Sequence, residues 1–245
     1  MKSFSNTYIF IFSTIMVIIV AALLSTAAIF LQPLQKKNIE INKKQNILSS
    51  INIESTPKTA NEKYSKHIIN SYVIDYKGNT KKGTDAFKIN LKKEITKNIE
   101  DINLPIYVGS VEKNEKVYII PIRGKGLWGP IWGYISFKND FNTIYGANFS
   151  HKSETPGLGA EIATTSFQEQ FIGKKIFDKS NKFISVSVMK NGTADQTSEY
   201  EVDGISGGTI TSKAVQKMIF NIIENYKAYF KDQIKQQKLL SETKK

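Results

Sequence analysis

Hydroxyl side chains and glycines are concentrated in residues 203–212, DGISGGTITS, directly ahead of an amphipathic helix predicted over residues 212–230. Backbone N–H groups are unpaired at a helix N-terminus and the dipole is positive there, which suits a phosphate group. Gly207 and Gly208 would let the backbone approach such a ligand closely. The surrounding hydroxyl groups belong to Ser206, Thr209, Thr211 and Ser212. By chemistry alone, the segment indicates either a phosphate-bearing ligand or an N-cap that follows a glycine turn.

A second glycine-rich stretch, residues 153–162, reads SETPGLGAEI. It brings the carboxylate of Glu154 and the hydroxyl of Thr155 together with backbone freed by Gly159. Such a loop can direct N–H groups toward a ring carbonyl, and Thr155 or Leu158 could flank a flat heterocycle. A simple turn has the same composition, so both interpretations stay open.

Residues 124–134, GKGLWGPIWGY, hold both tryptophans of the chain, Trp128 and Trp132. Tryptophan in such a setting can close the edge of a sheet or lie at a membrane interface. It can also form an aromatic wall for a planar ligand or a partner subunit. The spacing alone favours the first, structural interpretation.

Length and composition limit the class of protein. The chain has 245 residues, enough for one domain with appendages, and a net charge of +12. Its basic residues are scattered and form no stripe with aromatic platforms, so we expect no nucleic-acid partner. The absence of cysteine excludes disulfides and thiol catalysis. His67 and His151 lie far apart without metal-ligand spacing, so no metal site is expected.

The most prominent feature is an apolar segment at residues 8–31, within a stretch free of charge from Ser3 to Gln35. At about 1.5 Å per residue it can span the hydrocarbon layer of a bilayer, about 30 Å thick. A cleaved signal peptide is the alternative, but its apolar region runs only about 7–15 residues. We therefore expect a single retained transmembrane helix at residues 8–31, preceded by a short N-terminus at residues 1–7.

The charges that flank this segment leave its orientation open. Four lysines follow the span, and one lysine with the N-terminal amine precedes it; the four are Lys36, Lys37, Lys43 and Lys44. Counted literally, the positive-inside rule places the large domain in the cytoplasm. The rule is weak for long translocated domains, so both orientations stay possible from charge alone.

Periodicity then divides the rest of the chain into a stalk with an N-terminal region at residues 32–100, a compact α+β domain at 101–230, and a charged tail at 231–245. A strand is predicted within 71–80, a surface helix over 85–100, and a brief helix within 166–174. Further strands are predicted within 116–124, 130–140, 142–151 and 182–192. The last ends in Asn-Gly, which indicates a β-hairpin. We expect a small antiparallel sheet packed against helices.

The sequence DGISGGT resembles the flavinylation motif of FMN-binding domains, Asp-Gly-x-Ser/Thr-Gly-Ala-Thr. The resemblance implies that Thr209 accepts FMN as a phosphoester, transferred from FAD by a flavin transferase. Asp203, Gly204, Ser206 and Gly207 match the motif, whereas Gly208 replaces the usual alanine.

The resemblance extends along nearly the whole chain, through KKQNIL at 43–48 and the segments at 124–134, 153–162 and 203–212. In this order they resemble the C-subunit family of sodium-translocating NADH:quinone oxidoreductases. That family implies a flavoprotein of the inner membrane that relays electrons between neighbouring subunits. It also implies covalent FMN on a periplasmic domain and places residues 1–7 in the cytoplasm. We expect no NADH site, because the chain has no dinucleotide fingerprint. The alternatives are the G subunit of an Rnf-type ferredoxin:NAD complex and an anchored structural module without flavin.

Overall fold

The computed structural model describes residues 5–112 and 115–242, and the chain divides into two compact units, Met1–Lys43 and Lys44–Lys245. The first unit consists of the N-terminal part of helix α1 (Asn6–Ser49). An 18-residue window of this helix has a mean hydropathy of 2.6, and none of the window is buried in the protein. The helix is therefore long and apolar enough to cross a membrane.

The second unit contains a six-stranded antiparallel sheet with the order β2-β1-β3-β4-β5-β6. Its strands are β1 (Ile68–Ile74), β2 (Thr80–Lys81), β3 (Leu104–Ser110), β4 (Lys116–Lys125), β5 (Pro130–Phe137) and β6 (Ile144–His151). A separate parallel pair consists of β7 (Ser187–Met189) and β8 (Glu201–Asp203). The architecture confirms the predicted α+β class.

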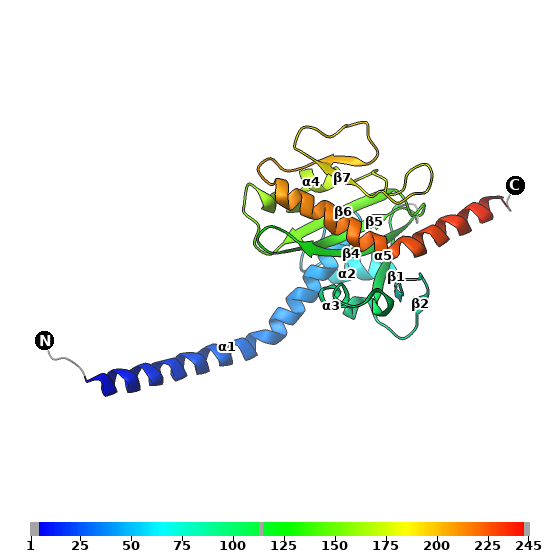
Figure 1. Ribbon diagram of the computed structural model, residues 1–245. Helices are drawn as coiled ribbons and strands as arrows, with labels where there is room; N and C mark the ends of the chain where they lie inside the picture. Colours follow the sequence, from blue (N-terminus) through cyan, green and yellow to red (C-terminus); the bar gives the residue numbers. More distant parts are fainter. Residues whose placement is uncertain (1–4, 113–114, 243–245) are drawn as a thin grey trace. The chain divides into compact units, whose positions relative to one another are not determined.

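Helices complete the second unit. Beyond α1 they are α2 (Ala60–His67), α3 (Leu91–Glu94), α4 (Thr165–Glu169) and α5 (Thr209–Glu242), with 3₁₀ turns at Ala86–Lys88, Ile99–Asp101 and Gly159–Ala163. Helix α5 lies across one face of the large sheet (Figure 1). This packing fixes the position of its first residue, Thr209, relative to the sheet.

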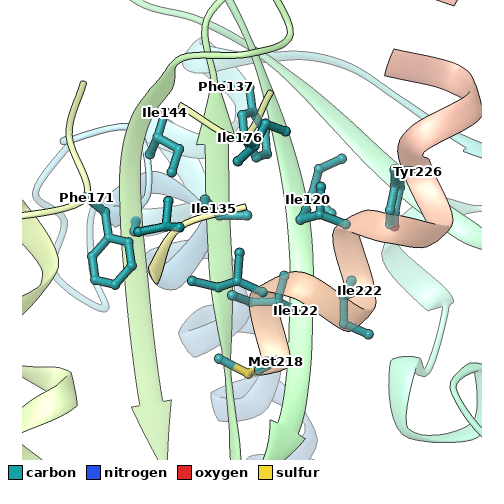
Figure 2. Packing of buried hydrophobic residues seen from close by; sticks show 14 of the residues in the cluster. Ile120, Ile122, Ile135, Phe137, Ile144, Phe171, Ile176, Met218, Ile222 and Tyr226 are labelled. Atoms are coloured by element: carbon teal, nitrogen blue, oxygen red, sulfur yellow. The ribbon is translucent and has the colours of Figure 1, made fainter. Parts of the chain in front are cut away.

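The main core lies between α5 and the sheet. Figure 2 shows Met218, Ile222 and Tyr226 of α5 beside Ile120 and Ile122 of β4, all of them buried. They lie on one side of α5 because residues four apart share a helix face. Burying this apolar surface is the dominant favourable term for the domain.

A smaller core lies on the opposite face of the sheet. On β4, Val117 and Ile119 belong to this second cluster, whereas Ile120 and Ile122 belong to the first. Ile47 and Leu48, at the end of α1, pack into the second cluster. The sheet is thus covered on both faces.

Buried tyrosines hold α5 in register. The hydroxyl of Tyr226 donates to the carbonyl of Pro105 at 3.0 Å, and the Tyr72 and Tyr229 hydroxyls lie 2.6 Å apart. Burial raises the pKa of Tyr226 well above its ordinary value, so its hydroxyl stays protonated and available as a donor. A polar group buried in this way specifies one position of the helix along the sheet.

Several sequence predictions are confirmed. Strands β5 and β6 lie within the predicted segments, β4 extends one residue beyond its segment, and β1 and α4 overlap theirs but begin earlier. Residues 231–242, expected only as a charged tail, continue α5 because they contain no glycine or proline.

Other predictions are wrong. The Asn191-Gly192 dipeptide does not form a hairpin, because β7 pairs in parallel with β8 and the Asp203 carboxylate holds the intervening loop. Residues 85–100 form a 3₁₀ turn, the four-residue helix α3 and the start of a second 3₁₀ turn, rather than one surface helix. Strand β3 was not predicted, because it is buried on both faces and shows no alternation.

Phe230→Ala tests the main core. Phe230 is fully buried against Phe137 and Phe141, with ring centroids 5.1 and 5.6 Å away. We expect the free energy of unfolding to fall by about 3–5 kcal/mol, as for large buried aromatics. Phe220→Ala is the matched control, since Phe220 lies on the same helix with 37% of its surface exposed, and should cost about 1 kcal/mol. Equal losses in urea denaturation would contradict this placement of the core.

Candidate functional site

The candidate site is organised by the buried side chain of Glu154, which follows β6. Its Oε1 accepts a hydrogen bond from the backbone N–H of Trp128 at 2.9 Å, and its Oε2 accepts one from the Thr211 hydroxyl at 2.5 Å. The backbone N–H of Glu154 donates to Nδ1 of His151 at 3.2 Å. One carboxylate therefore joins the β4–β5 turn to the first turn of α5.

The small size of Gly159 makes room for this hydrogen bond. A Cβ at Gly159 would lie 2.6 Å from Oε2 of Glu154 and would also meet the Thr211 hydroxyl. Loop 153–159 can therefore fold over the start of α5 only with glycine at this position. Thr211 is 1% exposed, so its hydrogen bond is shielded from water.

The glycine-rich segment before α5 is a tight turn. The backbone N–H of Gly208 donates to the carbonyl of Ile205 at 3.0 Å, and Gly207 adopts a φ of +69°, which favours glycine. The Ser212 hydroxyl accepts the N–H of Ile205 at 2.9 Å. Ser212 is thus committed to holding the turn.

Asp203 anchors the other end of this segment. Its Oδ1 accepts the backbone N–H groups of Thr193 and Ala194, each at 3.0 Å, and its Oδ2 accepts the Gln196 side chain at 2.9 Å. These hydrogen bonds, that of Ala194 first, lower the pKa of Asp203 below its ordinary value of 3.8. The hydrogen bonds of Asp203 therefore stabilise the folded protein above about pH 3.8. This stabilisation is lost as the pH falls through the lowered pKa that Asp203 has in the folded state.

Helix α5 begins at Thr209 with unpaired donors. The first hydrogen bond back along the chain runs from Ser212 N–H to Gly208 O at 2.9 Å. Within residues 5–112 and 115–242, no acceptor meets the backbone N–H groups of Thr209, Ile210 and Thr211. The Thr209 side chain is exposed beside them. These donors can bind an anion such as a phosphate.

A cavity of about 270 Å³ opens next to Thr209. Eight of the ten predicted site residues line it: Glu154, Thr155, Leu158, Gly159, Gly207, Gly208, Thr209 and Thr211. Ser206 and Ser212 do not, since Ser206 lies exposed in the turn and Ser212 is buried beneath it. The structure thus brings together two segments about fifty residues apart in the chain.

Apolar side chains form walls around this cavity. Trp128, Leu158 and Ile210 are 66, 42 and 61% exposed, and Leu127 lies next to Trp128. Exposed apolar groups gathered around unpaired donors suit a ligand with a flat apolar part and an anionic part. Sequence reasoning missed Leu127 and Ile210, although each adjoins a residue that it had singled out.

The two tryptophans differ in their surroundings. Trp128 lies in the β4–β5 turn and lines the cavity, so the interpretation as a plug for the sheet edge is wrong for this residue. Trp132 lies within β5, and the guanidinium of Arg123 is 5.9 Å from the centroid of its ring. Only Trp128 is placed to contact a ligand in this cavity.

Residues 126–224 match the family model of the FMN-binding domain, a range that includes both segments of the site. The C subunit of the Na(+)-translocating NADH-quinone reductase from Vibrio vulnificus is 30% identical over 215 residues, covering 81% of this chain and 83% of that protein. The same subunit from Neisseria meningitidis serogroup B is 30% identical over 231 residues, covering 87% of each. The chain belongs to this C-subunit family.

A solved member of the C-subunit family has the same fold. The crystal structure of the C subunit of the Na(+)-translocating NADH-quinone reductase from Parabacteroides distasonis is 44% identical, with a TM-score of 0.75. The matched region covers 82% of this chain and 96% of the crystallised chain. The predicted resemblance is thereby confirmed, and the Rnf-type alternative is not.

Thr211→Val tests the role of Glu154 in building the site. The substitution keeps the shape of the side chain but leaves Oε2 of Glu154 without its buried donor. We expect the free energy of unfolding to fall by about 1.5–3 kcal/mol, the range for hydrogen bonds to charged groups. Thr209→Val is the matched control and should stay within about 0.5 kcal/mol, because Thr209 is exposed. Equal effects in chemical denaturation would show that this hydrogen bond does not stabilise the site.

Proposed function

We propose that this protein carries FMN bound covalently through its phosphate to Oγ1 of Thr209, and relays electrons within a Na(+)-translocating NADH-quinone reductase. The observation that carries the proposal is the exposed Thr209 hydroxyl beside three unpaired N–H groups, at the edge of a cavity with apolar walls. FMN, when bound, supplies the electron chemistry.

The residues present fit the two parts of this cofactor. The N–H groups of Thr209, Ile210 and Thr211 would hold the phosphate, and the helix dipole would offset its charge. The flat ring would contact the apolar walls, of which Trp128 and Leu158 are the most suitable for stacking. The cavity volume of about 270 Å³ lies just below the range of about 300–1,000 Å³ that is usual for ligand pockets, so part of the ring would stay open to a neighbouring subunit.

Glu154 would act on the cofactor indirectly. Both of its oxygens already accept hydrogen bonds from the protein, so its role is to hold Trp128 and Thr211 in place around the ligand. Ser212 likewise shapes the turn. Of the ten residues predicted to bind the cofactor, we therefore propose Thr209, Leu158 and the backbone at 207–211 as the direct contacts.

Attachment requires a flavin transferase and FAD as donor. The Thr209 oxygen forms a bond to the flavin-side phosphorus, the bond from that phosphorus to the adenylate breaks, and AMP leaves. The threonine proton passes to a base of the transferase. The match to the FMN-binding domain supports this proposal over a structural module without flavin.

The covalent bond also suits the proposed location. We propose that α1 anchors the chain in the inner membrane by a single pass, with the domain on the periplasmic side and the other reductase subunits beside it. A domain outside the cytoplasm cannot replace lost FMN from the cytoplasmic supply. A covalent bond prevents this loss, because the cofactor cannot dissociate. The apolar window of α1 supports the anchor.

Thr209→Ala tests the attachment site. We expect complete loss of covalent flavin, because the acceptor oxygen is removed, seen as loss of in-gel fluorescence and of the FMN mass on the tryptic peptide. Thr211→Ala is the matched control and should retain the flavin, since its hydroxyl is turned to Glu154. Flavin that persists in Thr209→Ala and vanishes from Thr211→Ala would move the site by two residues. Circular dichroism checks that both variants fold.

Limited proteolysis of spheroplasts tests the orientation of the domain. A protease added from outside should digest the chain beyond about residue 40, because the proposed topology exposes the whole domain. A cytoplasmic marker protein should survive in the same sample. Protection of the domain would show that the lysines after the apolar segment determine the topology and keep it inside.

A further inference from the structure

A second cavity, of about 510 Å³, also begins at Thr209. It shares Thr209 and Ile210 with the first cavity, but its other walls come from the end of β4 and from α5. A third cavity, of about 480 Å³, continues from it past Arg123 and Asn221. Together the two cavities form one groove along α5, from Thr209 to Asn225. This part of the helix is about 24 Å long, at a rise of about 1.5 Å per residue.

The groove is strongly basic. Its charged lining residues are Arg123, Lys125, Lys213, Lys217 and Lys97, and no acidic residue lines either cavity. We call these five residues the basic groove. Within the part of the chain that the structure describes, only Lys97 among them forms an ion pair, with Glu94 at 2.8 Å. Lys125, Lys213 and Lys217 therefore carry charges that no ion pair in the described residues neutralises, while the guanidinium of Arg123 lies over the Trp132 ring.

The start of α5 adds to this positive charge. Acidic residues are the stabilising type near a helix N-terminus, yet the first turn of α5 contains none. Lys213 follows one turn after Thr209 instead, beside the three unpaired N–H groups. An arrangement that is locally unfavourable for the helix is expected where function requires it.

The flavinylation motif itself offers few side chains for recognition. Asp203 is occupied in holding the loop at 193–196, and Ser212, just beyond the motif, holds Ile205. The glycines contribute no side chain, so mainly Ser206 and Thr209 remain exposed. An enzyme that selects Thr209 on the folded domain needs further contacts, and the basic groove is the charged surface that reaches Thr209.

We propose that the basic groove is the docking surface for an acidic segment of the flavin transferase. This inference rests on the proposed function, because it requires Thr209 to be the acceptor. The groove would hold about seven residues of extended chain, at about 3.3 Å each. At its far end, Ile95 and Ile99 are 38 and 53% exposed and provide apolar contacts for the same partner.

The position of Thr209 favours the transferase over a neighbouring subunit as occupant. Thr209 is itself part of the wall at the near end of the groove, so a segment that fills this end lies against the acceptor residue. A transferase must make this contact to bring the donor phosphorus within bonding distance. A subunit that exchanges electrons needs only to approach the flavin and has no need of Thr209.

Charge reversal tests the docking surface. The full-length chain in detergent, as the Lys213→Glu/Lys217→Glu double variant, is incubated with purified transferase and FAD, and covalent flavin is followed by in-gel fluorescence. We expect kcat/KM for the chain to fall about tenfold or more, through KM, because complementary charge accelerates encounter. Added salt should lower the kcat/KM of the wild-type chain toward that of the variant, because it screens the charges. The matched control is Lys231→Glu/Lys235→Glu, two exposed lysines with the same spacing on the same helix, which should behave as wild type.

Several outcomes would overturn the inference. Equal kcat/KM in both double variants and the wild type would show that the groove does not dock the transferase, while leaving Thr209 as the acceptor. A fall in kcat with KM unchanged would assign the lysines to the chemical step. A wild-type chain that acquires no covalent flavin would refute the proposed function itself.

A second measurement separates the transferase from a neighbouring subunit. The double variant, fully loaded with flavin by prolonged incubation, is assembled into the reductase and assayed for quinone reduction. Wild-type activity would support the transferase as occupant. Loss of assembly would show that the groove binds another subunit and would overturn the assignment.

Discussion

The Glu154 carboxylate accepts hydrogen bonds from Trp128 and Thr211, groups that lie 26 and 57 residues away along the chain. Through them it holds the β4–β5 turn and the first turn of α5 against loop 153–159. Hydrogen bonds to a charged group are worth more than neutral ones, and leaving a buried carboxylate without partners would be costly. The cavity beside Thr209 keeps its shape because this carboxylate is satisfied within the protein.

The parts of the fold that depend on local pattern could be predicted from the sequence. Strands β4 and β6 and the core face of α5 follow from periodicity. The glycine turn places Thr209 close to a helix N-terminus, but its choice as acceptor came from the motif resemblance alone. The partners of Glu154 could not be predicted, because nothing near position 154 indicates positions 128 and 211. The parallel pairing of β7 and β8 was missed for the same reason, since the local Asn-Gly signal is overruled by contacts to Asp203.

Helix α5 combines two roles that are usually separate. Its apolar face, with Met218, Ile222 and Tyr226, supplies much of the main core. Its first turn leaves backbone donors unpaired beside an exposed hydroxyl. A helix fixed by extensive packing moves little at its first residue, so a ligand bound there is held in a defined position relative to the sheet. Stability and ligand placement are therefore properties of one element.

The basic groove contains Arg123 and Lys125 from β4 and Lys213 and Lys217 from α5, which become neighbours only when the helix packs on the sheet. An enzyme that recognises these residues together distinguishes a folded domain from an unfolded one. Attachment of the flavin would then occur only after folding, and the covalent flavin would mark the chains that had folded. Protein that misfolds during export would not acquire flavin and would stay colourless. Every flavin-carrying domain that enters the complex would then have reached its native structure first.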